Sequence, residues 1–345
     1  MKARQLEKLG IPSDLAKWAK WLAPELRKQR DLTPQQVKEL LADVAQHPQR
    51  YRDDDLLHEL AAALDRRAQS QAAAEQGFEE QDPPAPWTQW GDDLDANSIE
   101  QLERAVRLPV AVRGALMPDA HLGYGLPIGG VLATDNAVIP YAVGVDIACR
   151  MKLTVLDLPP HQLVGEQERF INAIEAETRF GMGASFVERG RGTPREHSVL
   201  DEDWNVSPVT RSNKDKAHAQ LGTSGSGNHF VEFGELTIED EHASAIGLQT
   251  GGTYLALLSH SGSRGPGAKV ASYYSNLAMN LHPELPKELR HLAWLDLDSH
   301  EGQEYWAAMQ LMGQFAAANH AMIHHHIAKH LGASVLTDVE NHHNF

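Results

Sequence analysis

The chain has 345 residues, 42% of them hydrophobic and 23% charged, a composition typical of globular proteins with one large domain or two. No apolar run approaches the roughly 20 residues that a membrane helix needs. The formal net charge of −16 argues against broad nonspecific binding to nucleic acids, and a single cysteine excludes an internal disulfide, so the expected compartment is the cytoplasm.

Residues 1–85 are expected to form a helical N-terminal extension that ends in a linker. One helix has complete boundary signals, with Thr33 as N-cap, Pro34 at the first helical position, Gln36 closing a capping box and Pro48 stopping it. A second helix is expected over 53–76, acidic at its start and basic later, as the helix dipole favours. The proline- and acid-rich segment that follows indicates the linker.

Residues 86–345 are expected to form one catalytic domain of mixed α and β structure, with a β-sheet core and surrounding helices. Short β-rich runs, punctuated by glycine, alternate with helical stretches. The strands are expected within 111–117, 129–147, 150–158, 228–236 and 253–263. Helices are expected over 163–180 and 301–331.

The run GVDIACR places Asp146 three residues before Cys149, after a β-like segment. A carboxylate and a thiolate together suit a divalent ion of intermediate softness, such as Zn, Mn or Co. Taken alone, the pair favours a buried free cysteine that acts as a small hydrophobic residue.

Two further segments combine glycine with residues that bind metals or phosphates. In GSGNHFVE, a strand would place Asn228, Phe230 and Glu232 on one face and His229 on the other. In HSGSRG, His260 ends an apolar run and an arginine follows four residues later, which suits a metal beside a phosphate. The alternatives are ordinary loops with a solvated histidine and arginine.

The remaining candidates are more ambiguous. Asp119 in the segment MPDAHLGYG suits a general base or a turn, and the local sequence favours the turn. His320 and His324 are four residues apart on an expected helix, where core packing is favoured over metal ligation. His342 and His343 point in opposite directions in an extended chain, so at most one of them faces a site.

Five motifs occur in order between about residues 110 and 345: MPDAHLGYGLPIGGV, GVDIACR, GSGNHFVE, HSGSRG and ENHHNF. Together they resemble the RtcB family of RNA-splicing ligases. The resemblance implies an RtcB-like catalytic domain and a GTP- and Mn-dependent RNA ligase. Such an enzyme joins a 2′,3′-cyclic-phosphate or 3′-phosphate RNA end to a 5′-hydroxyl end, through a guanylylated enzyme and an RNA–GMP intermediate, in tRNA splicing or RNA repair.

The resemblance also implies a role for each motif residue. Two Mn ions would be held by Asp146, Cys149, His229, His260 and His343, although by softness these donors also suit Zn. The residues that would bind the guanine nucleotide are Asn228, Glu232 and Asn344, with Phe230 lining its pocket and Arg264 on a phosphate. Asp119 matches an acidic residue near the catalytic centre. Mn and GTP are therefore the expected cofactors, and tRNA or damaged RNA is the expected partner.

The sequence departs from the family pattern in three places, one of which is Arg150, which follows the cysteine where glycine is common. The family's guanylylated histidine lies in a further C-terminal stretch that no motif here matches, so a fragment or a short form without the covalent GMP intermediate is expected. Ala148 stands where asparagine is common. The alternatives are a metal-dependent cyclic phosphodiesterase and a ligation-inactive protein that binds RNA ends. The loop with Arg189, Arg191 and Arg195 is a candidate RNA contact or a solvated surface loop.

Overall fold

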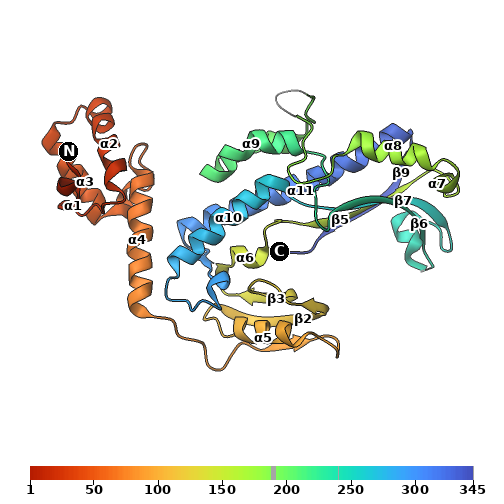
Figure 1. The fold of residues 1–345 in the computed structure, drawn as a ribbon, viewed down its shortest axis with the longest axis horizontal. Helices are drawn as coiled ribbons and strands as arrows, with labels where there is room; N and C mark the ends of the chain where they lie inside the picture. Colours follow the sequence, from red (N-terminus) through yellow and green to blue (C-terminus); the bar gives the residue numbers. More distant parts are fainter. Residues whose placement is uncertain (188–191, 240, 345) are drawn as a thin grey trace. The chain divides into compact units, whose positions relative to one another are not determined.

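The computed structural model describes residues 1–187, 192–239 and 241–344. The fold is mixed α and β, as expected (Figure 1). The chain divides into two compact units. Unit 1 comprises Met1–Glu80 with Met279–Arg290, and unit 2 comprises Gln81–Ala278 with His291–Phe345. In the described ranges, we find no helix with the length and apolar character needed to cross a membrane.

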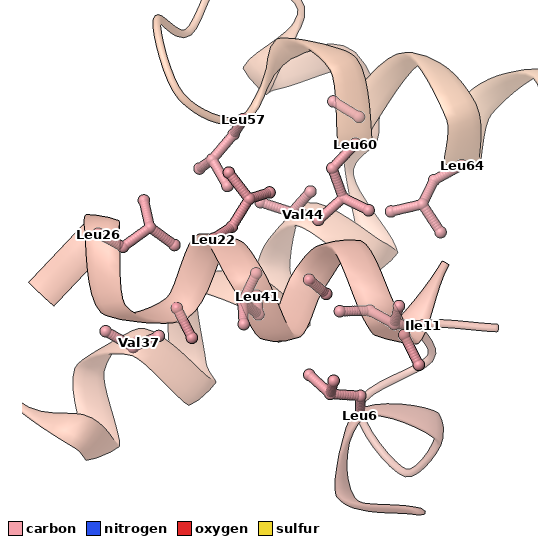
Figure 2. Close-up of a cluster of buried hydrophobic side chains, with 14 residues drawn as sticks. Leu6, Ile11, Leu22, Leu26, Val37, Leu41, Val44, Leu57, Leu60 and Leu64 are labelled. Atoms are coloured by element: carbon pink, nitrogen blue, oxygen red, sulfur yellow. The ribbon is translucent and has the colours of Figure 1, made fainter. Parts of the chain in front are cut away.

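The N-terminal part of unit 1 is helical. Its helices are α1 (Ala3–Glu7), α2 (Ala16–Arg30), α3 (Pro34–Gln46), the 3₁₀ helix η1 (Pro48–Tyr51) and α4 (His58–Gln76). Figure 2 shows the leucines and valines of α2, α3 and α4 pointing toward one another in a core that includes Leu26, Leu41 and Leu60. The predicted start of α3 is confirmed, because Thr33 and Gln36 form the reciprocal capping box.

Helix α4 begins at His58 and not at Asp53, so this predicted boundary was wrong. The carboxylate of Asp54 accepts hydrogen bonds from the backbone N–H groups of Leu56 and Leu57, each at 3.0 Å. Arg30 also contacts the Asp54 carboxylate. These bonds hold a turn in front of the helix, because an aspartate side chain competes with the helical backbone for N–H donors.

The main sheet of unit 2 is antiparallel, with strand order β6-β7-β5-β9. Its strands are β5 (Arg150–Leu156), β6 (Phe230–Thr237), β7 (Thr253–Ser261) and β9 (Val335–His342). Helices α8 (Gln167–Glu177) and α11 (His300–Leu331) pack on this sheet (Figure 1). The core between them contains Phe170, Leu257 and Ile323. The predicted strands and the long C-terminal helix are thereby confirmed.

A second sheet has the order β1-β2-β3 and is accompanied by helix α5. The elements are β1 (Trp87–Gln89), α5 (Ala96–Ala105), β2 (Ala111–His121) and β3 (Ile128–Thr134). Asp119 lies on strand β2, so the turn that its local sequence favoured is wrong. The pairing of His121 with Ile128 extends β2 to that point, and the turn follows it.

Shorter elements complete unit 2. Strands β4 (Ala137–Val138) and β8 (Leu295–Asp296) pair with each other, and the helices are α6 (Pro140–Val143), α7 (Gln162–Gly165), α9 (Pro208–Gln220) and α10 (Arg264–Leu281). Residues 140–143 are helical where a β-rich run was expected. Pro140 is the first residue of α6, a position that suits its fixed φ and its missing N–H.

Candidate metal centre

The ends of three strands bring the proposed metal ligands together. Cys149 directly precedes β5, His229 directly precedes β6, and His260 is the penultimate residue of β7. Phe230 and Met151 are both register partners of His260, so the starts of β6 and β5 lie on either side of the end of β7. Antiparallel pairing therefore brings three motifs that are distant in the sequence together in space.

The donor atoms of this cluster lie within bonding range of a single ion. The Cys149 Sγ atom is 3.0 Å from His260 Nε2 and 3.6 Å from His229 Nε2. All three ligand atoms lie within 4.8 Å of one another, the one such grouping of three in the described ranges. One thiol and two imidazoles are a donor set that binds Zn, Mn or Co.

Asp146 adds a carboxylate to the cluster. Its Oδ2 atom lies 2.8 Å from His229 Nε2. This oxygen is buried, and the contact with His229 is not aligned as a hydrogen bond, so the oxygen retains unused acceptor capacity. A Cβ atom on Gly262 would overlap the carboxylate, so only glycine leaves it room. A buried, unsatisfied carboxylate oxygen beside three convergent donors fits a bound cation.

Backbone carbonyls orient both cluster histidines. The Nδ1 atom of His229 lies 3.2 Å from the carbonyl oxygen of Ser224, and that of His260 lies 3.1 Å from the carbonyl oxygen of Asn228. For His260, donation of Nδ1–H to this carbonyl leaves Nε2 unprotonated and free to bind a metal. The same does not follow for His229, because the Arg264 guanidinium, which can only donate, lies 3.1 Å from its Nδ1 atom. Both Nε2 atoms face Cys149, so the rings already present the atoms that ligation needs.

The charge states of the cluster favour binding of a cation. Burial raises the pKa of the Cys149 thiol, and the negative charge of Asp146 raises it further. Burial opposes ionisation of Asp146, but the contacts with His229 and Cys149 and the positive charge of Arg264 together outweigh it and lower the pKa of this carboxyl. Burial lowers the pKa values of His260 and His343. The cluster therefore combines a carboxylate, neutral imidazoles at His260 and His343, and a thiol whose proton a metal would displace.

The segment after β9 lies beside the cluster. The ring centroids of His343 and His260 are 5.3 Å apart, and the His343 N–H donates to the carbonyl of Cys149 over 3.2 Å. The Asn344 side-chain amide donates to the carbonyl of Asp146 over 2.7 Å, while its Oδ1 atom is buried without a partner. His342 is the last residue of β9, and it and His343 are both exposed, so the ring contact with His260 is what distinguishes His343. The structure thus brings His343 to the cluster.

Arg264 is the first residue of α10 and not part of a loop. Its φ of 56° is in the left-handed region, and its Nη1 atom lies 3.1 Å from His229 Nδ1. Its Nε–H donates to Thr223 Oγ1 over 3.3 Å. A Cβ on Gly225 would overlap the guanidinium, which explains a glycine there. A cation of fixed position therefore adjoins the cluster.

The other predicted site residues are more dispersed. The Phe230 ring lies edge-on to His260 with centroids 5.9 Å apart, and Glu232 shares its face of β6 because Val231 between them packs in the core. Asn228 and Glu232 are exposed beside the cluster strands. Asp119 is exposed on β2, and in the described structure it forms no hydrogen bond or ion pair with the cluster.

Comparison with known proteins gives the family. The family model for tRNA-splicing ligase RtcB matches residues 101–345. The chain belongs to the RtcB family. It is 30% identical to the tRNA-splicing ligase RtcB of Thermococcus kodakarensis, over 66% of this chain and 54% of that protein. It is 33% identical to the RtcB of Aeropyrum pernix, over 61% and 50%. It is 30% identical to RNA-splicing ligase RtcB homolog 1 of Entamoeba dispar, over 66% and 48%.

The chain spans about half the length of the curated RtcB proteins that it matches. The matched region includes every cluster residue described above. The helices of residues 1–76 lie outside it.

The structure of this RtcB family member also reveals a buried support that the motifs did not indicate. Asn319 of α11 accepts a hydrogen bond from the Gly222 N–H over 2.7 Å and donates to Ser261 Oγ over 3.1 Å. Ser261 Oγ donates to the carbonyl of Ser224 over 2.7 Å, and this carbonyl also faces His229. The sequence does contain a signal for this support, because Asn319 is a polar residue on the largely apolar, buried face of α11.

Two other interpretations are settled by burial. His320 and His324 lie beneath the sheet and each contacts Ser259 Oγ at 2.7 Å, as the favoured core role predicts. Arg195 is buried and pairs with Glu177 at 3.0 Å, so it is neither solvated nor free to contact RNA. Arg189 and Arg191 lie outside the described residues.

Proposed function

We propose that this chain forms the metal-binding part of an RNA ligase. The ligase joins 2′,3′-cyclic-phosphate or 3′-phosphate RNA ends to 5′-hydroxyl ends, with GTP as cofactor and through guanylylated intermediates. The observation that carries the proposal is the convergence of Cys149, His229 and His260 on one point beside the Asp146 carboxylate. Membership of the RtcB family supplies the reaction class.

The proposed metal ligands are Asp146, Cys149, His229, His260 and His343, with Asp146 able to bridge two ions. The expected metal is Mn, and Zn is the alternative. When bound, such ions polarise a phosphoryl group and stabilise the attacking and leaving oxygens. The protein contributes ligand orientation, since backbone carbonyls fix two of the rings.

The residues next to the cluster are suited to a guanine nucleotide and an RNA phosphate. Glu232 offers a carboxylate and Asn344 a buried unpartnered oxygen, and both accept hydrogen bonds from N–H donors such as those of guanine. Asn228 is exposed in the turn before β6, not on the strand as expected, and the ring of Phe230 is half-buried. Arg264 supplies positive charge for a phosphate. Asp119 keeps a proposed catalytic role on the resemblance alone.

Ligation of defined RNA ends tests this proposal. The chain, extended by the C-terminal stretch of an RtcB relative, is incubated with Mn, GTP, an RNA ending in a 2′,3′-cyclic phosphate and an RNA with a 5′-hydroxyl end. We expect a joined product that depends on GTP and is lost in Cys149→Ala. Opening of the cyclic phosphate without GTP and without joining would instead identify a phosphodiesterase. Binding of RNA without any turnover would identify a protein that only recognises RNA ends.

A further inference from the structure

The positive charge of this acidic chain is concentrated at one end. Residues 1–35 contain eight lysines and arginines but four aspartates and glutamates, whereas the whole chain has 31 basic and 47 acidic residues. A local reversal of this kind indicates a surface for a negatively charged partner. The segment belongs to unit 1, whose helices the RtcB family match does not include.

Helix α2 arranges this charge along one face. Its exposed positions include four cations and one aromatic residue, Lys17, Lys20, Trp21, Arg27 and Lys28, which we call the basic stripe. Their spacings of 3, 4, 10 and 11 residues from the first place them on the same side of the helix. The opposite side packs into the core of unit 1 through residues such as Leu22 and Leu26.

Stability explains only part of the basic stripe: the helix dipole favours Arg27 and Lys28 in the last turn of α2, but not Lys17 and Lys20 near its start. Elsewhere in unit 1, Arg30 pairs with Asp54 and Arg67 pairs with Asp14. In the described part of the chain, none of the four stripe cations forms an ion pair, and like charges three residues apart weaken a helix. Trp21 is 66% exposed, so its large apolar ring contributes little to the core of unit 1. Unpaired cations around an exposed aromatic ring are typical of surfaces that bind single-stranded nucleic acid.

We propose that the basic stripe of α2 binds single-stranded RNA, with the cations on the phosphates and Trp21 stacked on an unpaired base. The identity of that RNA as the ligation substrate rests on the proposed function, but the binding itself does not. Four cations on one helix face match the repeated charge of an RNA backbone, and an indole ring stacks on any base. The surface would therefore hold RNA with little dependence on sequence.

The test measures binding separately from catalysis. Fluorescence anisotropy follows the full chain binding a single-stranded RNA with a 3′-hydroxyl and a 5′-phosphate, which offers no ends to join. The double variant Lys20→Glu/Lys28→Glu is expected to bind this RNA about tenfold or more weakly than the parent. The plot of the logarithm of its association constant against the logarithm of salt concentration is expected to be less steep by about 1.4. Trp21→Ala is expected to weaken binding by about tenfold with an unchanged salt slope, because stacking releases no counterions.

A matched control is Lys287→Glu with Lys329→Glu, which makes the same change in net charge at exposed lysines outside the stripe. This control is expected to bind RNA as the parent does. Because all these side chains are exposed, circular dichroism should show an unchanged melting temperature, which separates lost binding from lost folding.

Two results would overturn the proposal. One is that the stripe variants bind RNA as tightly as the parent chain. This result is expected if the stripe contacts an acidic protein surface instead of RNA. The other is an equal loss of affinity in the control, which would indicate a general effect of charge. Cys149→Ala is expected to keep full RNA affinity. Normal stripe-dependent binding by the extended chain, if that chain joins no RNA, would therefore contradict the proposed function and leave this inference standing.

Discussion

Two residues at the candidate metal centre adopt a backbone conformation that side chains normally avoid. Ala148 has a φ of 57° and Arg264 a φ of 56°. For a residue with a Cβ atom, this left-handed conformation costs about 1–2 kcal/mol. Ala148 lies within the turn that Cys149 closes by donating its N–H to the carbonyl of Asp146 over 3.0 Å. The strained turn thus aims both side chains at the same point, as is common where strain serves function.

Gly262→Ala tests whether the Asp146 carboxylate must lie where it is. The new methyl group would overlap that carboxylate, so we expect the affinity for Mn or Co to fall by about tenfold or more. Isothermal titration calorimetry measures this affinity. Gly234→Ala is the control, because its methyl group would meet no atom within 4 Å in strand β6 of the same sheet. Equal affinity in the two variants would remove Asp146 from the proposed ligands.

Cys149→Ser tests the thiol directly. Cobalt bound to the parent is expected to show a thiolate-to-metal charge-transfer absorption, which serine cannot produce. The thiol is protonated without metal, because burial raises its pKa, so cobalt binding should also release a proton. A pH-indicator dye in weakly buffered solution detects that proton as cobalt is added. Unchanged absorption and full ligase activity in the variant would show that Cys149 is a structural residue.

At the scale of elements, helix α11 supports the centre from beneath the sheet. Its buried face is largely apolar but includes Asn319, His320 and His324. Each of these residues bonds to the loop 222–224 or to strand β7, which carry or precede the cluster histidines. The Nε2 atom of His320 is buried without a partner, but the bonds that these residues do form favour one arrangement of the elements they join. The helix therefore fixes the separation of the two segments that bear His229 and His260.

Asn319→Ala is expected to lower the free energy of unfolding by about 2–6 kcal/mol. It leaves the N–H of Gly222 and the carbonyl of Thr223 buried without this partner, at about 1–3 kcal/mol each. Urea denaturation gives this value. Asn276→Ala, at an exposed site on α10, should change it by less than about 0.5 kcal/mol. Metal affinity is expected to fall only in Asn319→Ala, and retention of affinity there would limit Asn319 to stability.

His320 predicts a loss of stability in mild acid. Burial lowers its pKa from 6.5 to about 3. The unfolded chain takes up this proton below pH 6.5 and the folded chain does not, so stability falls with pH between these two values, by about 1.4 kcal/mol per pH unit. Urea denaturation between pH 6.5 and 5.5 should show a slope that is smaller by this amount in His320→Asn. His325→Asn, at an exposed position of α11, should retain the parental slope.

The sequence predicted elements whose signals are local, and missed features that depend on distant partners. The capping box of Thr33 and the alternation along β5–β7 act within a few residues, so α3 and the strands could be placed. The start of α4 depends on the turn at Asp54, and the placement of Asp119 depends on pairing with β3. The motifs named the members of the cluster, but only the register of β5, β6 and β7 brings them together.

At the scale of the whole molecule, the two units have separate cores. The core cluster of unit 1 consists of residues between Leu6 and Leu64, and that of the main sheet of residues between Leu156 and Leu331. Separate cores predict separate unfolding transitions, since each unit buries its own apolar surface.

Leu60→Ala tests this separation. It removes a fully buried side chain from unit 1 and should destabilise that unit by about 2–5 kcal/mol. Calorimetry is expected to show one transition shifted to lower temperature, with metal affinity unchanged. Leu336→Ala, at a half-exposed position of β9, should leave both transitions near their parental temperatures. A single transition that shifts as a whole would show that the units unfold together.

The single cysteine of the chain also gives it a built-in chemical reporter. Any thiol-specific reagent that modifies this protein must react at residue 149, inside the candidate metal centre. Because this thiol is buried and protonated, labelling needs a small reagent and alkaline pH, and a mass increase of one label per chain would then report the fraction of empty centres. Protection against alkylation by added ions would rank Mn, Zn and Co on the native sequence, directly in a cell extract.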